Sequence, residues 1–342
     1  MIKSFRALVT TQNKDGRFEN IIEQKTTKEL PEGDLLIRVE YSSLNYKDAL
    51  VASGAKGITN RYPHTPGIDA AGVVEESNNI AFPPGTSVIV TGFDLGMNTS
   101  GGFSEYIRVP SEWAIKCPDN LTTKEAMMIG TAGLTAGLST LSIVEDLLIE
   151  NAKIIVSGAT GGVGSIGVKL CSQLGAKVTA ITGKVEKTDF LKELGALEII
   201  DRNDFIDNTI LPLNKGIYDA AIDVVGGNIL SSIIASMHYN GIITVCGNVR
   251  SPKFETSVFP FILRGNSLIG IDSAKCSLED RENVWNHFAT DWKLNELKRM
   301  CNTVDLDGVI PEIKKILKGE QTGRVLLQLL SLIHISEPTR PY

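Results

Sequence analysis

Glycines recur at every third position directly after a short apolar run. Lys153–Ser157 (KIIVS) is predicted to be a buried strand, and Gly158, Gly161 and Gly164 follow it with the spacing G-x-x-G-x-x-G. Such glycines permit a tight turn, the approach of main-chain N–H groups to a pyrophosphate, and close packing of the next helix. The N-terminus of that helix adds partial positive charge. The spacing therefore predicts a dinucleotide-binding loop, with a flexible surface turn as the alternative.

The residues after the second predicted strand, Lys177–Thr182, indicate which dinucleotide binds. About twenty residues after the glycine loop, an NAD site places Asp or Glu on the ribose 2′-hydroxyl. Here Thr182, Gly183 and Lys184 stand at that place. A hydroxyl and an ammonium suit a 2′-phosphate, so NADPH is the expected cofactor. Arg202, after the third strand, is a second candidate for the adenosine phosphate; the alternative is that both cations are ordinary surface residues.

Metal ligands are not evident. The five cysteines lie far apart, without a C-x-x-C pair and without histidine at ligand spacing: Cys117, Cys171, Cys246, Cys276 and Cys301. An odd, scattered set argues against a disulfide framework and favours reduced thiols in the cytoplasm. His64 is isolated and is expected to be a hydrogen-bonded loop residue. We therefore expect no metal.

Composition limits the classes of function. The chain has 342 residues, 34 Lys+Arg against 40 Asp+Glu and a net charge of -6. This length implies about two domains, and no block of cations favours nucleic acid or an anionic membrane as a partner. Neither a signal-peptide core nor the 18 apolar residues of a spanning helix is expected. A soluble cytoplasmic protein with a small-molecule substrate is predicted.

Periodicity divides the chain. Residues 1–125 carry short alternating strands such as Leu36–Tyr41 with Pro and Gly turns, which predicts a β-rich barrel or sandwich. In residues 126–273, strands alternate with helices, of which the first, Ser165–Leu174, is closed by Gly175. This α/β pattern predicts a doubly wound parallel sheet. The remaining strands are expected at 177–182, 197–201, 218–225, 241–247 and 267–272. Residues 274–329 are expected to pack back onto the first domain.

Four further motifs, in order along the chain, carry a family resemblance. They are Ser43–Ala49 (SLNYKDA), Pro66–Gly72 (PGIDAAG), Ile129–Gly133 (IGTAG) and Pro260–Gly265 (PFILRG). Up to about Leu329 the chain resembles the zinc-free quinone oxidoreductase branch of the medium-chain dehydrogenase/reductase superfamily, and most of all its acrylyl-coenzyme A reductases and quinone oxidoreductases. The resemblance implies a GroES-like catalytic domain (1–125), a Rossmann NADPH-binding domain (126–273), a C-terminal return (274–329) and a homodimer joined at the Rossmann sheets.

The resemblance also implies a reaction. Zinc-dependent relatives carry Cys near the position of Asn45 and a His-Glu pair where this chain has Ile68 and Asp69, so a metal is not expected. Hydride transfer to the β-carbon of an enone, enoyl thioester or quinone spreads charge that hydrogen-bond donors can stabilise. Tyr46 is the expected donor and Asn45 the next candidate. The alternative is that Tyr46 only packs against the nicotinamide ribose.

Other residues receive roles from the same resemblance. Arg324 is expected either to help close the cleft or to be structural, and Lys47, Lys56 and Arg61 either to bind coenzyme A phosphates or to be scattered surface cations. The favoured function is an NADPH-dependent acrylyl-coenzyme A reductase. The alternatives are a quinone reductase, a non-catalytic NADPH-binding protein and a zinc alcohol dehydrogenase. The implied cofactor contacts are Tyr46, Thr131, Thr160, Gly161, Gly162, Val163, Thr182, Gly183, Lys184, Arg202, Asn248, Ile262 and Ser273.

The end of the chain departs from the rest. Ser331–Tyr342 resembles a translated adapter sequence of the kind that contaminates some gene assemblies. Residues 330–342 are therefore expected to be a non-native, loosely packed tail, and truncation at Leu329 is expected to leave activity unchanged.

Overall fold

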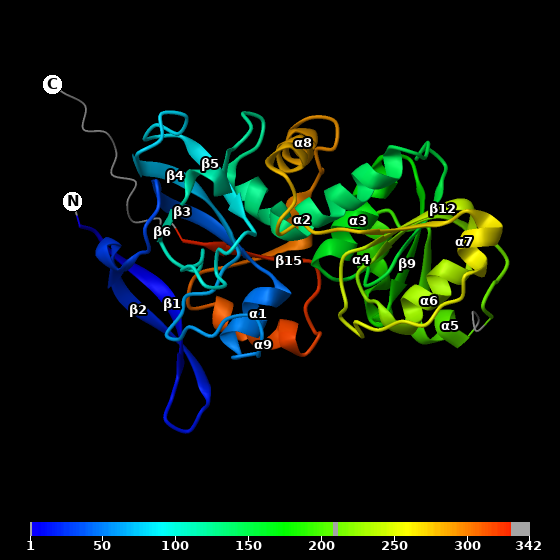
Figure 1. The fold of residues 1–342 in the computed structure, drawn as a ribbon, viewed down its shortest axis with the longest axis horizontal. Coiled ribbons are helices and arrows are strands. Elements are labelled where there is room, and N and C mark those ends of the chain that lie inside the picture. The colour runs from blue at the N-terminus through cyan, green and yellow to red at the C-terminus, as the bar shows by residue number, and fades with distance from the viewer. Residues whose placement is uncertain (1, 208–210, 330–342) are drawn as a thin grey trace.

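The computed structural model describes residues 2–207 and 211–329 of the chain. Within them, a first lobe built on antiparallel strands and a second lobe built on a parallel sheet lie side by side (Figure 1). The long helix α2 (Thr123–Val144) runs between them. The predicted non-native segment 330–342 lies outside the described residues.

The first lobe contains a seven-stranded sheet with the order β14-β15-β3-β4-β5-β7, and β6 also pairs with β3. Strand β3 is shared along its length, because its first half pairs with β6 and its second half with β15. Ile37 and Val39 are buried while Arg38 and Glu40 are partly exposed, as the alternating pattern predicts. A separate hairpin, β1 (Ser4–Gln12) and β2 (Phe18–Thr26), completes the β-rich part. The strand bounds are β3 (Leu35–Leu44), β4 (Asp69–Ser77), β5 (Ser87–Thr91), β6 (Tyr106–Val109), β7 (Ala114–Lys116), β14 (Cys301–Val304) and β15 (Arg324–Gln328).

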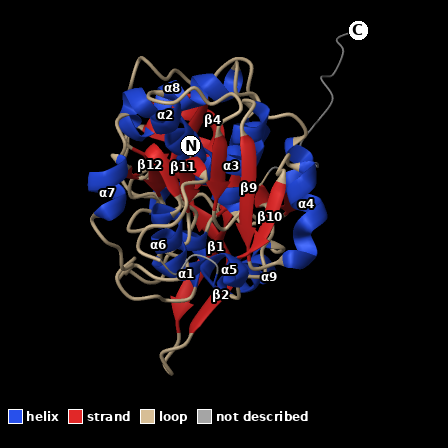
Figure 2. Cartoon of the chain, turned by 90° about the vertical axis from the view of Figure 1, so that its right-hand side faces the viewer, coloured by secondary structure: helices blue, strands red, loops and turns tan. Residues whose placement is uncertain are grey.

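The second lobe is a six-stranded sheet whose strands all run parallel, in the order β10-β9-β8-β11-β12-β13. Helices lie beside it on both faces (Figure 2). The strand order reverses between β8 and β11, which is where such sheets open a crevice for ligands. The predicted mixed α/β fold is thus confirmed. The bounds are β8 (Lys153–Val156), β9 (Lys177–Thr182), β10 (Glu198–Asp201), β11 (Tyr218–Asp223), β12 (Met237–Val245), β13 (Ser267–Gly270), α3 (Gly162–Gln173), α4 (Thr188–Glu193), α5 (Arg202–Asp207), α6 (Gly227–Ala235) and α7 (Phe259–Arg264).

Helix α2 belongs to both lobes. It begins at a capping box, in which Thr122 Oγ1 accepts from the Glu125 N–H and Glu125 accepts from the Thr122 N–H. It bends at Gly130, where φ is 54° and ψ is -162°. The helix is long and apolar enough to span a membrane, so the expectation that no segment approaches this limit is wrong. However, 78% of its apolar window is buried inside the protein, as in the core helix of a folded domain.

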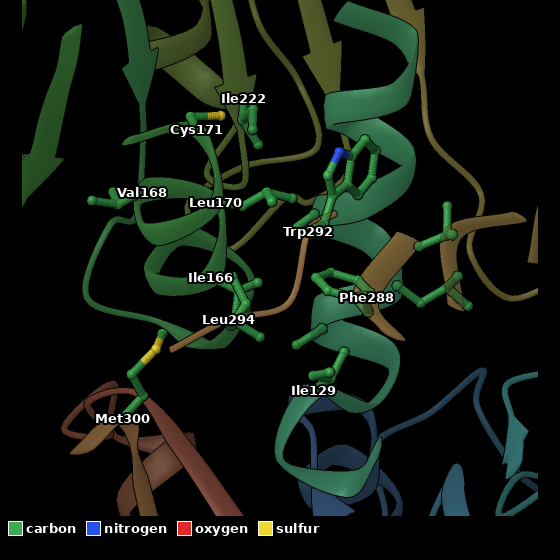
Figure 3. Packing of buried hydrophobic residues seen from close by; sticks show 14 of the residues in the cluster. Ile129, Ile166, Val168, Leu170, Cys171, Ile222, Phe288, Trp292, Leu294 and Met300 are labelled. Carbon is green, nitrogen blue, oxygen red and sulfur yellow. The ribbon is translucent and has the colours of Figure 1, made fainter. Parts of the chain in front are cut away.

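The return segment joins the lobes. It contains α8 (Leu278–Ala289), α9 (Val309–Leu317) and the strands β14 and β15, and β15 pairs with β3 of the first lobe, as Figure 1 shows in red and blue. Phe288 and Trp292 pack beside Ile129 of α2 and Ile166 of α3 in one apolar cluster (Figure 3).

A buried arginine ties α8 to the first lobe. Arg281 is 1% exposed, and its Nη1 donates to the main-chain oxygen and to the Oγ1 of Thr91, both at 2.7 Å. Its guanidinium also lies 4.6 Å from the ring centroid of Phe93.

Candidate active site and dinucleotide site

A buried carboxylate, Asp69, stands where the two lobes meet. Ser43 Oγ and Asn45 Nδ2 donate to its Oδ2 at 2.6 and 2.8 Å. Thr131 donates twice, from its main-chain N–H to Oδ2 at 2.9 Å and from its hydroxyl to Oδ1 at 2.5 Å. A side chain at the bend, Gly130, would not fit beside this carboxylate, since a Cβ there would lie 2.6 Å from Asp69 Oδ2. Asp69 therefore has its hydrogen-bonding capacity met by protein donors from β3, from α2 and from Asn45, which precedes the helix α1 (Tyr46–Ala52).

Arg324, the first residue of β15, is the cation of this centre. It is 3% exposed, and its Nη2 lies 2.9 Å from Ser43 Oγ and 3.9 Å from Asp69 Oδ2. Its Nη1 donates to Asn45 Oδ1 at 3.2 Å, and its Nε to the Met128 carbonyl at 3.2 Å. Burial lowers the pKa of Arg324, and the nearby Asp69 opposes that shift. We call Asp69, Arg324, Ser43, Asn45 and Thr131 the interlobe centre.

Helix α1 (Tyr46–Ala52) begins against the interlobe centre. Asp48 fixes its start by accepting from the N–H groups of Asn45 at 2.8 Å, Ile68 at 2.8 Å and Gly67 at 3.1 Å. Burial, together with the charge of Asp69, raises the pKa of Asp48 to about 7, and the N–H donors oppose that rise. Tyr46 is the first residue of the helix and is 43% exposed. Within the described part of the chain its hydroxyl makes no hydrogen bond, so it is available to a ligand.

The glycine loop follows β8, as the sequence predicts. Gly158 has φ +58°, and a Cβ on Gly164 would lie 2.3 Å from the Gly158 carbonyl oxygen. The loop can therefore make its turn only with glycine at these places. Helix α3 begins at Gly162, three residues before the predicted Ser165, and its first N–H groups have no partners within the helix. The loop thus has the tight turn and the free N–H groups that a pyrophosphate site requires.

Two family models and several known proteins are similar to this chain. Residues 31–119 match the family model described as alcohol dehydrogenase GroES-like domain, and residues 162–290 match the model described as zinc-binding dehydrogenase. "Putative quinone oxidoreductase YhfP" of Bacillus subtilis is 40% identical over 95% of this chain and 99% of its own length. Acrylyl-CoA reductase AcuI of Ruegeria pomeroyi is 35% identical over 95% of this chain and 99% of its own. The chain belongs to the medium-chain dehydrogenase/reductase superfamily.

Two solved structures that resemble this chain carry nicotinamide cofactors. The YhdH oxidoreductase of Salmonella enterica in complex with NADP has a TM-score of 0.91 and 36% identity, with 95% of this chain and all of that chain covered. YhfP of Bacillus subtilis with NAD bound has a TM-score of 0.92 and 40% identity, with 96% and 100% covered. These similarities confirm the predicted family and fold and support a nicotinamide cofactor.

The adenosine end of the expected cofactor site lies beyond β9. Lys184 is half-buried, its N–H donates to Thr182 Oγ1 at 3.0 Å, and its Nζ donates to the Gln321 carbonyl. Arg202 is exposed, and its guanidinium lies against the main chain of Gly183, where a Cβ would come within 2.7 Å of Cζ. The two predicted cations thus flank one turn. Two positively charged side chains, from Lys184 and Arg202, therefore lie beside the exposed residue Gly183.

The residues at the interlobe centre do not fit zinc, although a matching family model carries that word in its description. Zinc needs thiolate, imidazole or free carboxylate ligands, whereas Asn45 and Thr131 present an amide and a hydroxyl and Asp69 is saturated with hydrogen bonds. Among the described residues, no group of three or more His, Cys, Asp and Glu is arranged to hold a metal ion. His64 is buried, and its main chain pairs with Thr10.

The other expected cofactor contacts lie in separate segments of the chain. Thr160 lies 3.4 Å from Thr182 between their hydroxyl oxygens, and Gly161 and Val163 lie in the loop and the first turn of α3. Asn248 lines an open hollow of about 360 Å³. Ile262 is 69% exposed on α7. Ser273 accepts from Thr135 at 2.7 Å between their hydroxyl oxygens and is partly buried.

The sequence-based prediction missed two features of the site. Asp69 was considered only as the place of an absent zinc ligand, although a carboxylate opening the apolar strand Asp69–Ser77 must be paired when buried. Asp48 was likewise overlooked, although an acidic residue at the third position of a helix is a capping signal. The basic residues proposed for coenzyme A lie on the outside of this lobe: Lys56 and Arg61 are exposed and Lys47 is partly exposed.

Proposed function

We propose that the protein is an NADPH-dependent, zinc-independent reductase of activated carbon–carbon double bonds, with acrylyl-coenzyme A as the favoured substrate. The observation that carries this proposal is the place of Arg324. Its guanidinium donates to Asn45, and its Nη1 comes within 3.0 Å of where a Cβ on Gly162 would lie. The glycine loop and the start of α1 therefore meet at one buried centre, so a nucleotide on the loop would have its reactive end beside Tyr46.

NADPH is preferred over NADH in this proposal because of the cations at the adenosine end. Lys184 and Arg202 would hold the 2′-phosphate, and the glycine loop with the N-terminus of α3 would hold the pyrophosphate. A carboxylate that would repel the phosphate is not found at the end of β9, where the chain has Thr182, Gly183 and Lys184. When bound, the reduced cofactor supplies the hydride for the acceptor.

Tyr46 is the residue proposed to stabilise the developing enolate, by donating a hydrogen bond from its exposed hydroxyl. Asn45 is a weaker candidate than expected, because its Nδ2 already donates to Asp69 at 2.8 Å and to the Ser43 carbonyl at 3.2 Å. Its role is to position the start of α1, and Asp48 holds the same turn from the other side. The alternative role for Tyr46, packing against the nicotinamide ribose, predicts a different result on removing the hydroxyl.

The substrate is tested by following NADPH oxidation with acrylyl-coenzyme A and, in parallel, with a soluble benzoquinone. We expect kcat/KM to be larger for the thioester. A preference for the quinone would favour the second candidate, a quinone reductase, which the 40% identity to YhfP supports. Binding of NADPH without reduction of either acceptor would favour a non-catalytic NADPH-binding protein. Stoichiometric zinc in the purified protein would instead revive an alcohol dehydrogenase.

The donor role is tested by Tyr46→Phe. We expect kcat to fall by at least about 100-fold, because losing one donor to a developing oxyanion typically costs roughly that factor or more, with little change in the affinity for NADPH. Tyr62→Phe is the matched control, since the Tyr62 hydroxyl donates to the Val51 carbonyl within the same lobe. An undiminished kcat in Tyr46→Phe would leave this residue a packing role.

A coenzyme A substrate, a homodimer and a cytoplasmic location complete the proposal. Lys47, Lys56 and Arg61 would meet the coenzyme A phosphates, and their joint replacement should raise KM for the thioester but not for the quinone. The edge strand β13 and the exposed apolar residues of α7 support a dimer, which light scattering of the purified protein would test. The five cysteines are free, as in a reducing compartment, and cell fractionation would test the location.

A further inference from the structure

Four consecutive residues, Gln321–Arg324, touch three separate parts of the site; we call them the strap. The Gln321 carbonyl accepts from Lys184 Nζ at the adenosine end. The Gly323 N–H donates to the Thr160 carbonyl of the glycine loop at 2.9 Å. Arg324 then donates to Asn45 at the interlobe centre. The strap thus connects the first lobe, through β15, to both phosphate-binding parts of the second.

The path of the strap depends on glycine. Gly323 has φ +64°, and a Cβ at this position would lie 2.3 Å from the Met300 carbonyl oxygen. Both facts exclude a larger residue without displacement of the chain. The main chain of the strap therefore passes closely between the Met300 carbonyl and the Thr160 carbonyl.

The strap also fixes the position of the Lys184 ammonium. A lysine ammonium has three N–H donors, and a flexible stem that leaves its position unspecified unless a donor is engaged. Here the Gln321 carbonyl engages one donor, which leaves two for a ligand. Burial lowers the pKa of Lys184, while Glu186 and Glu320 oppose the shift. The hydrogen bond to the Gln321 carbonyl therefore restricts the position of the Lys184 ammonium.

Two polar atoms of the strap point to a ligand independently. Gln321 Oε1 and Thr322 Oγ1 are both buried and have no hydrogen-bond partner among the described residues. Such atoms are uncommon in folded proteins because each loses its bonds to water without replacement. Both lie in the stretch that joins Lys184 to Thr160, where the cofactor is proposed to bind.

We propose that the strap positions Lys184 for the 2′-phosphate, so that selectivity for NADPH over NADH depends on the strap as well as on Lys184. This inference rests on the proposed use of NADPH. Its physical basis is that a displaced strap releases the ammonium from the Gln321 carbonyl and moves the charge away from the phosphate. NADH has no group at that position, so it should lose only the small effect that displacement has on the glycine loop through Thr160, an effect that NADPH shares.

The test measures dissociation constants for NADPH and NADH by cofactor fluorescence, without turnover. Gly323→Ala should raise the dissociation constant for NADPH about 10-fold, the size of a lost hydrogen bond to a charged group, and that for NADH less than about 2-fold. Gly319→Ala is the matched control, because Gly319 has φ +70° but nothing within 4 Å of its Cβ position. It introduces similar backbone strain just before the strap without displacing it, and should leave the ratio of the two constants unchanged.

A double-mutant cycle separates positioning from a general structural effect. In a Lys184→Met background, Gly323→Ala should lose its selectivity and alter the two dissociation constants by the same factor. An equal loss of NADPH and NADH affinity in Gly323→Ala with Lys184 present would overturn the proposal. So would a selective loss that persists in the Lys184→Met background.

Hydrogen exchange provides a measurement that needs no change at Gly323. In the wild-type protein, NADPH should slow amide exchange in peptides covering the strap at least about 3-fold more than NADH does, each at saturation. Lys184→Met should abolish that difference. Equal protection by the two cofactors would overturn the proposal for the strap while leaving NADPH as cofactor. If neither cofactor binds the wild-type protein, it is the proposed function itself that fails.

Discussion

The two ends of the proposed cofactor site are built on opposite principles. At the interlobe centre, Asp69 and Arg324 are buried, and the protein supplies the partners of both. At the adenosine end, Arg202 is exposed and has no ion pair within residues 2–207 and 211–329, and Lys184 keeps two donors uncommitted. The first arrangement holds its side chains in place without a ligand. The second leaves positive charge whose partner must come from outside.

This contrast predicts which property a substitution at each end should change. Because the interlobe centre is internally satisfied, changes there should act on folding and on the geometry of Tyr46. Because the adenosine end is unsatisfied, changes there should act on the choice of cofactor and hardly on folding. Three substitutions test the contrast.

The largest effect is expected for Arg324→Met. Removing the cation leaves the buried Asp69 without its opposite charge at 3.9 Å and takes one donor each from the Met128 carbonyl and Asn45 Oδ1. Breaking a buried ion pair in this way typically costs about 3–5 kcal/mol in the free energy of unfolding. Urea denaturation measures this loss. Arg281→Met is the comparison, since Arg281 is also a buried arginine that joins the lobes but contacts Thr91 rather than Asn45. Both variants should lose stability, and only Arg324→Met should also lower kcat by more than about 10-fold.

Lys184→Glu should act on the cofactor instead. A carboxylate in place of the ammonium puts like charge beside the 2′-phosphate, so KM for NADPH should rise about 100-fold and that for NADH much less. Lys187→Glu makes the same change of charge within the same turn and should have only a small effect. Equal effects of Lys184→Glu on both cofactors would remove Lys184 from the phosphate site.

The smallest effect concerns pH. The pKa of Asp48 is raised from 3.8 to about 7, so the folded state holds a proton that the unfolded state releases. Its contribution to stability is present below about pH 4 and is lost as the pH rises through about 7. Asp48→Asn does not titrate, so from about pH 5 to pH 8 the wild type should lose roughly 3 kcal/mol relative to the variant. A gap that stays constant over this range would show that Asp48 is charged throughout.

Local features of the chain could be predicted from its sequence. The glycine loop, β8 and β9 depend on neighbouring residues and on a short apolar period, and β9 occupies Lys177–Thr182 as expected. Pairing across the chain could not be predicted in this way. Ser43 and Arg324 are 281 positions apart, and nothing in either segment alone specifies that β15 lies beside β3.

The sequence also does not reveal the partners that Arg324 and Thr131 have in the buried centre. An arginine after glycine near the end of the chain is compatible with a surface role, and only the folded structure places it against Asn45. The bend of α2 is a similar case, because Gly130 inside an apolar run suggests either a weak helix or a turn. In the structure it frees the Thr131 N–H to meet Asp69.

Helix α2 has a consequence for recombining this protein with its relatives. An exchange of the parallel-sheet lobe that began at residue 126 would cut the helix within its first turn and separate the capping residues Thr122 and Glu125 from the segment they initiate. It would also pair Gly130 and Thr131 of one parent with Ser43 and Asp69 of another. A functional chimera should therefore take α2, β3 and β15 from the same parent protein. These three segments must be exchanged together although they are far apart in the sequence.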